Sequence, residues 1–141
     1  MPFLVISATD GTILLNLKQH WVNLSWTGAW NENNLTASIP QGLFQLKNLT
    51  IVKYSQINCQ NKLTGSIPQR LFQLKNLSVV WLFRNQLSGE IPIAIESPNL
   101  IGLDLSENNL TGEILTSIES LNLNELDLSE NNLTGSIPMD F

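Results

Sequence analysis

Few residues of this 141-residue chain have side chains suited to catalysis or metal binding. There is one histidine, His20, and one cysteine, Cys59, so the sequence allows no internal disulfide and has no CxxC redox motif. No cluster has metal-ligand spacing, and the sequence shows no nucleophile–base pair and no phosphate-binding loop. We therefore expect a protein that is not an enzyme and uses no metal or cofactor, with His20 structural or solvated and Cys59 an idle thiol.

The side chains that remain suit recognition. Trp81 and Phe83 form an aromatic pair, and Asp104 and Asp127 are acidic residues 23 positions apart. Aromatic side chains are enriched at binding hot spots. The two aspartates belong to identical copies of the ten residues LDLSENNLTG, at 103–112 and 126–135, so a repeated element must place them.

Repetition runs through most of the chain. The segment IPQGLFQLKNLT at 39–50 recurs as IPQRLFQLKNLS at 67–78. An Asn-x-Leu anchor appears at positions 33, 61, 85, 108 and 131, and the isoleucines that follow are spaced by 28, 24, 23 and 23 residues. The pattern LxxLxLxxNxL within a period of 20–29 residues is typical of leucine-rich repeats. It predicts an α/β repeat solenoid, a short right-handed coil of about five repeats with a concave parallel β-sheet.

Each part of the repeat has a physical reason. The alternating apolar residues predict a short strand. The glycine after each of the last four anchors suits a tight turn with an unusual φ angle. The asparagine can satisfy backbone groups of a buried turn, because its amide carries two donors and an acceptor. Stacked repeats would align these side chains in a structural ladder of Asn61, Asn85, Asn108 and Asn131.

The two ends differ from the repeats. Residues 1–32 are interpreted as an N-terminal extension followed by a capping helix, because apolar residues recur at helical spacing after the N-cap candidate Asp10. Residues 33–141 hold the repeats, with an irregular insertion near 55–60 and a truncated C-terminal repeat. An open solenoid end exposes apolar surface and a strand edge, which predicts self-association through the C-terminal end.

The strand pattern also predicts which side chains face outward on the concave sheet, because successive residues of a strand alternate between its two faces. Stacked like charges cost up to about 1 kcal/mol, which a basic or partly apolar peptide would offset. Three columns follow: Ile51, Val79, Gly102 and Glu125; Lys53, Trp81, Asp104 and Asp127; and Ser55, Phe83, Ser106 and Ser129. The candidate ligand-binding residues are Lys53, Ser55, Trp81, Phe83, Asp104, Ser106, Glu125, Asp127 and Ser129. A structural role for the aspartates is the alternative interpretation.

The composition limits the partners. Net charge −5 argues against nucleic acid, which favours a basic surface. No apolar run approaches the roughly 18 residues that span a bilayer. The apolar run Phe3–Ile6 lacks the basic region and the length of a signal peptide. The compartment therefore stays open. Most of the Asn-x-Ser/Thr sequons in this chain are part of the repeat consensus, so they can occur without being glycosylated. The six candidate N-glycosylation sites are Asn23, Asn34, Asn48, Asn76, Asn109 and Asn132.

The consensus NxLTGxIPxxLxxLxNL and the segment TILLNLKQHW resemble the ectodomains of plant leucine-rich-repeat receptor kinases, and the chain looks most similar to the HAESA-like group. The resemblance implies an extracellular or plasma-membrane protein that binds a peptide on its concave face and pairs with receptor kinases. It also marks departures, because SWTGAWNEN lacks the cysteines of the family's cap, the repeats are fewer, and the kinase motifs are missing. Two alternatives are an inhibitor of cell-wall hydrolases and an ice-binding protein, although the mixed Lys/Trp/Asp column argues against ice binding.

Overall fold

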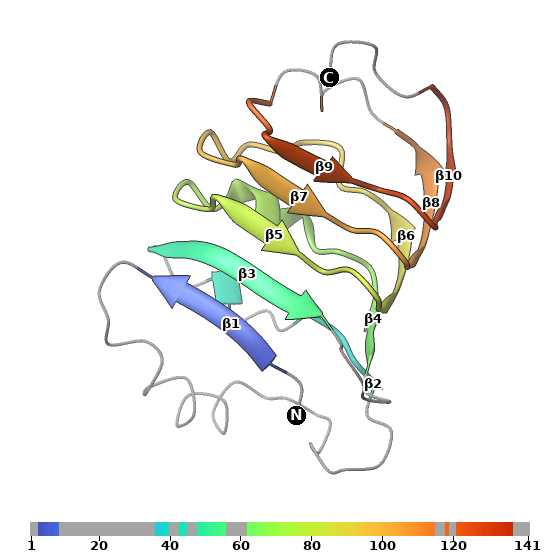
Figure 1. The fold of residues 1–141 in the computed structure, drawn as a ribbon, viewed down its shortest axis with the longest axis horizontal. Helices are drawn as coiled ribbons and strands as arrows, with labels where there is room; N and C mark the ends of the chain where they lie inside the picture. The colour runs from blue at the N-terminus through green and yellow to red at the C-terminus, as the bar shows by residue number, and fades with distance from the viewer. Residues whose placement is uncertain are drawn as a thin grey trace.

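The computed structural model describes residues 3–8, 36–39, 43–44, 48–55, 62–114, 118 and 121–136. These residues form two five-stranded sheets, in the orders β1-β3-β5-β7-β9 and β10-β8-β6-β4-β2. Figure 1 shows the strands of each sheet stacked side by side, with the chain passing from one sheet to the other in every coil. The predicted leucine-rich-repeat solenoid is confirmed.

The first sheet contains the N-terminal strand β1 (Phe3–Ala8) and one strand from each of four successive coils. The four are β3 (Leu49–Ser55), β5 (Val79–Trp81), β7 (Gly102–Asp104) and β9 (Glu125–Asp127), which are parallel to one another. In β3, β5 and β7 the central residues Val52, Val80 and Leu103 are buried. The residues on either side of each face outward, as the alternation of a strand requires.

The second sheet was not predicted. Its strands are β2 (Thr36–Ala37), β4 (Lys62–Gly65), β6 (Gln86–Glu90), β8 (Asn109–Glu113) and β10 (Asn132–Thr134), and all are parallel. They consist of the residues around Asn-x-Leu-Thr/Ser-Gly, which the sequence analysis interpreted only as turns. The predicted unusual φ is present, however, with values from 77° to 89° at Gly65, Gly89, Gly112 and Gly135.

Gly112 illustrates why this position lacks a side chain. Besides its φ of 87°, a Cβ placed on Gly112 would lie 2.7 Å from Cγ of Glu90 in the preceding repeat. Both the left-handed backbone and the close approach of the neighbouring coil therefore favour glycine.

The core lies between the two sheets and a connecting layer. The connection after β4 forms the 3-10 helix η2 (Gln69–Gln73), which buries Leu71 and Phe72, and Pro68 precedes it. Leucines at equivalent places of successive repeats, such as Leu87 and Leu110, are fully buried in one continuous cluster. No α-helix occurs among the residues that the structure describes, and the predicted capping helix lies outside them.

The N-terminal residues give an unexpected result. Strand β1 (Phe3–Ala8), interpreted from the sequence as part of an extension, pairs with β3 in antiparallel register from Phe3↔Ser55 to Ala8↔Leu49, with a shift between Ser7 and Ala8. It therefore covers the edge of the first sheet (Figure 1). The predicted capping helix, His20, the insertion after Ser55 and Cys59 lie outside the described residues.

Among the described residues, none of the helices has the length and apolar character that crossing a membrane would demand.

Candidate functional site

The outward face of the first sheet brings the predicted columns together. The parallel register aligns Lys53 with Trp81, Trp81 with Asp104, and Asp104 with Asp127. The next column aligns Ile51, Val79, Gly102 and Glu125 in the same way. Neighbouring strands lie about 4.8 Å apart, so each column forms a continuous row of side chains. We call this surface, with both columns, the concave face.

Trp81 lies at the centre of the concave face and is half-buried. The Nζ atom of Lys53 lies 3.3 Å from the centroid of its ring, which is cation–π geometry. On the side of the next strand, Nε1 of Trp81 lies 3.7 Å from the place where a Cβ on Gly102 would be. This is an ordinary van der Waals distance, so the indole lies beside Gly102 without crowding it, and Lys53 covers part of the ring.

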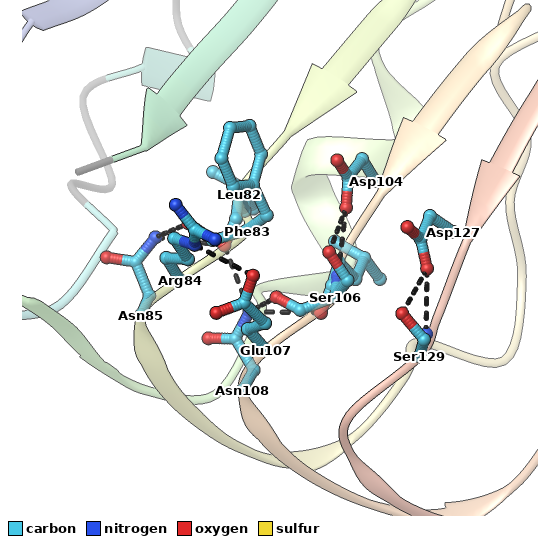
Figure 2. A network of polar contacts seen from close by, with 11 residues as sticks. Leu82, Phe83, Arg84, Asn85, Asp104, Ser106, Glu107, Asn108, Asp127 and Ser129 are labelled. Atoms are coloured by element: carbon cyan, nitrogen blue, oxygen red, sulfur yellow. Dashed lines mark hydrogen bonds and ion pairs between the residues drawn. The ribbon is translucent and has the colours of Figure 1, made fainter. Parts of the chain in front are cut away.

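The two aspartates have a structural role in addition to their place on the concave face. Oδ1 of Asp104 accepts hydrogen bonds from the backbone N–H and the hydroxyl of Ser106, at 3.0 and 2.7 Å. Asp127 repeats this arrangement with Ser129 at 2.9 and 2.6 Å, as Figure 2 shows. Each aspartate thereby closes the turn after its strand and is held in one orientation. The sequence analysis gave a structural role for the aspartates as an alternative to ligand binding. One oxygen of each carboxylate has that structural role, and the other oxygen does not take part in these hydrogen bonds.

The third predicted column is only partly exposed. Ser106 is 6 % exposed, so it contributes almost no surface for a ligand. Phe83 is half-buried and Ser129 is exposed, while the side chain of Ser55 lies outside the description. The prediction treated the turn after each strand as a continuation of the strand. It was therefore wrong about the exposure of Ser106.

The asparagine ladder joins successive repeats. Oδ1 of Asn85, Asn108 and Asn131 accepts the backbone N–H of a leucine in the preceding repeat, at 2.9–3.0 Å. Their Nδ2 groups donate to backbone carbonyls, which for Asn108 are those of Leu82, Leu105 and Ser106. Asn61 lies outside the described residues. These side chains hold the coil together and take no part in the concave face.

The sequence analysis did not single out a charged row beside the ladder. Arg84, Glu107 and Glu130, each directly before a ladder asparagine, have positive φ values of 52–56°. Nε of Arg84 lies 2.7 Å from Oε1 of Glu107 in the next repeat, as Figure 2 shows. These three residues are 23 positions apart, which is the repeat period, so the sequence could have predicted that they lie in one row.

Other predicted sites are exposed or outside the description. Asn48, Asn76, Asn109 and Asn132 are exposed, and Asn23 and Asn34 lie outside the described residues. In the part of the chain that the structure describes, no group of three or more His, Cys, Asp or Glu side chains could hold a metal ion. The described side chains of the concave face include Lys53, Trp81, Asp104 and Asp127, which can make aromatic and ionic contacts.

Comparisons with known proteins agree with this architecture. The family model "Leucine Rich Repeat" matches residues 99–121 and 122–141. No curated protein is significantly similar in sequence. Among solved structures, the chain is similar to the Arabidopsis receptor kinase HAESA in complex with the peptide hormone IDA and the co-receptor SERK1, with a TM-score of 0.67 and 38 % identity over 78 % of this chain.

Two further structures extend the similarity. The BIR3–SERK2 complex from Arabidopsis thaliana gives a TM-score of 0.67 and 31 % identity over 79 % of this chain. The ectodomain of the receptor kinase SOBIR1 from Arabidopsis thaliana gives 0.67 and 25 % identity over 99 % of this chain. This chain spans 18 %, 65 % and 71 % of the HAESA, BIR3–SERK2 and SOBIR1 chains, respectively.

Proposed function

Because this chain is a leucine-rich-repeat protein similar to the ectodomains of plant receptor kinases, we propose that it is a non-enzymatic recognition module that binds a peptide or protein on its concave face. The observation that supports this most is Trp81, a half-buried tryptophan at the centre of an otherwise polar row. Tryptophans in such positions are frequent binding hot spots.

The nature of the partner follows from the similar structures by analogy. HAESA is seen with a peptide hormone and a co-receptor, and SERK2 is seen with BIR3. A peptide or a receptor-like protein is therefore the partner we propose for this chain. The leucines of the last described repeat, Leu126, Leu128 and Leu133, are only partly buried, and they form the surface we propose for self-association or for pairing with receptor kinases.

Ice binding fits the concave face less well. An ice-binding surface needs flat, regular columns of Thr or Asn, whereas the central row here aligns a lysine, a tryptophan and two aspartates. Inhibition of a cell-wall hydrolase would use the same general surface for protein contact, so Trp81→Ala would be expected to weaken that binding as well.

A displayed library of random 12-residue peptides tests the proposal. The 141-residue chain is used for selection, and affinities of the selected peptides are measured for the wild type and for Trp81→Ala. Loss of a hot-spot side chain costs about 2 kcal/mol, so we expect affinity to fall at least about tenfold. Gln86→Ala, an exposed position in the second sheet, is the matched control and should leave affinity unchanged. Equal binding by wild type and Trp81→Ala would contradict the concave-face site.

A further inference from the structure

The charges of this protein are segregated along its length. All seven Lys and Arg residues occur before residue 85, and ten of the twelve Asp and Glu residues occur after it. The first part, residues 1–84, has a formal charge of +5 and the second, residues 85–141, has −10. The described residues keep this division, because their five cations all precede their first carboxylate, Glu90. Each described repeat stacks on the one before it, so the division becomes an electrostatic gradient along the described part of the solenoid.

The concave face shows the same gradient at the level of single side chains. Along its central row a lysine is followed by tryptophan and then by two aspartates, and Glu125 adds a third carboxylate in β9. Lys53 is engaged with the ring of Trp81. The salt bridge between Arg84 and Glu107 is the one ion pair in the described part of the chain. Asp104, Asp127 and Glu125 therefore have no cationic partner among the described residues.

A second, independent feature of this face is the aromatic ring at its centre. The indole N–H of Trp81 is buried and has no acceptor within the residues that the structure describes, so it is covered by the protein and is not presented to a ligand. The side chain as a whole is only half-buried, so part of its ring remains available for apolar contact. This aromatic contact is not accounted for by the acidic residues.

We propose that the ligand of the concave face is an extended cationic peptide segment with a fixed direction. This inference rests on the proposed function and names the partner class of the same site. An apolar residue of the peptide packs against the exposed part of Trp81, and basic residues lie over Asp104 and Asp127. The gradient sets the direction, with the basic residues toward the C-terminal repeats.

The spacing of the strands supports this arrangement. Trp81 and Asp127 are two strands apart, which is about 9.6 Å, and an extended peptide covers this distance in about three residues. The preferred segment therefore has an apolar residue with two basic residues within about four positions of it. Because Oδ1 of each aspartate is held by its serine, the other oxygen of each carboxylate is the one that meets the basic side chains.

The same peptide library provides the test, with the wild-type chain and the double variant Asp104→Asn/Asp127→Asn. The amide oxygen of asparagine can still accept the hydrogen bonds from Ser106 and Ser129, so the variant is expected to fold. We expect the peptides selected by the wild type to be enriched in Lys and Arg and to lose affinity about tenfold in the double variant. Their affinity for the wild type should fall as NaCl is raised from 50 to 300 mM, because salt screens exposed charges.

Glu90→Gln/Glu113→Gln is the matched control, because it removes two exposed acidic residues from the second sheet. It should leave peptide affinity unchanged. Peptides that depend on Trp81 but lack an excess of Lys and Arg, or that bind the double variant as well as the wild type, would overturn the cationic-peptide inference and leave the proposed function intact. If no selected peptide depends on Trp81, both the inference and the proposed function are wrong.

Discussion

At the residue scale, single buried amides join successive repeats through several hydrogen bonds each. Asn108 is 8 % exposed, and its amide connects three carbonyls and one backbone N–H from two repeats. Buried backbone groups need partners, and in this turn no strand supplies them. The repeated asparagine in the sequence was therefore sufficient to predict the ladder.

Asn108→Ala should be strongly destabilising. The substitution leaves the N–H of Leu87 without its acceptor. The carbonyls of Leu82, Leu105 and Ser106 lose one donor each but keep a second one, from Asn85, Asn131 and Arg84, respectively. One unsatisfied buried group costs about 1–3 kcal/mol, and the weakened hydrogen bonding of the three carbonyls adds to it, so we expect a net loss of about 3 kcal/mol. Equilibrium unfolding in urea measures this as a lower midpoint.

Asn109→Ala is the matched control, because the neighbouring Asn109 is exposed in β8. We expect a change below about 0.5 kcal/mol there. Asn131→Ala should lie between the two, since Asn131 makes the same contacts but is only partly buried. Similar losses for Asn108→Ala and Asn109→Ala would show that the ladder does not stabilise the coil.

At the element scale, the two sheets were predictable to different degrees. The first sheet follows from the alternation of Leu and Val around each strand, so its register was available from the sequence. The second sheet depends on hydrogen bonds between successive Asn-x-Leu-Thr/Ser-Gly segments, and these form only after the coils stack. Local patterns resemble turns there because each strand ends at a glycine with positive φ.

The same reasoning explains why β1 was missed. Its pairing with β3 joins residues about 45 positions apart, and the apolar run Phe3–Ile6 has no repeat counterpart. Contacts at such separation leave no periodic signal in one sequence. Ser106 was misplaced for a related reason, because the chain turns after β7 and its side chain rotates inward to Asp104.

Strand β1 should protect the edge of the first sheet. If residues 3–8 are replaced by a Gly-Ser repeat, β3 loses its antiparallel partner and presents unpaired backbone groups. We expect a lower melting temperature and concentration-dependent association, measured by circular dichroism and sedimentation velocity. Replacement by alternating Thr and Val keeps strand propensity and should behave as the wild type. Identical behaviour of the two replacements would show that the backbone pairing is dispensable.

At the scale of the whole molecule, stability is a property of the stack. A repeat buries its apolar face against its neighbours, so the repeats with neighbours on both sides should be the most stable. Burial follows this order. Leu87 and Leu110 are fully buried, whereas Leu133, at the equivalent place in the last described repeat, is partly exposed. The electrostatic gradient has the same origin, because stacking converts a division along the sequence into a division in space.

This order predicts unequal effects of the same substitution. Leu110→Ala should cost about 3 kcal/mol, because it opens a cavity between packed coils. Leu133→Ala should cost about 1 kcal/mol, because part of that side chain already contacts solvent. Urea unfolding of the two variants would measure both losses. Native-state hydrogen exchange gives the matching map, with the strongest amide protection in residues 62–114 and weaker protection in 121–136. Equal losses in the two variants together with uniform protection would mean that the coil unfolds as one unit, with no difference between central and terminal repeats.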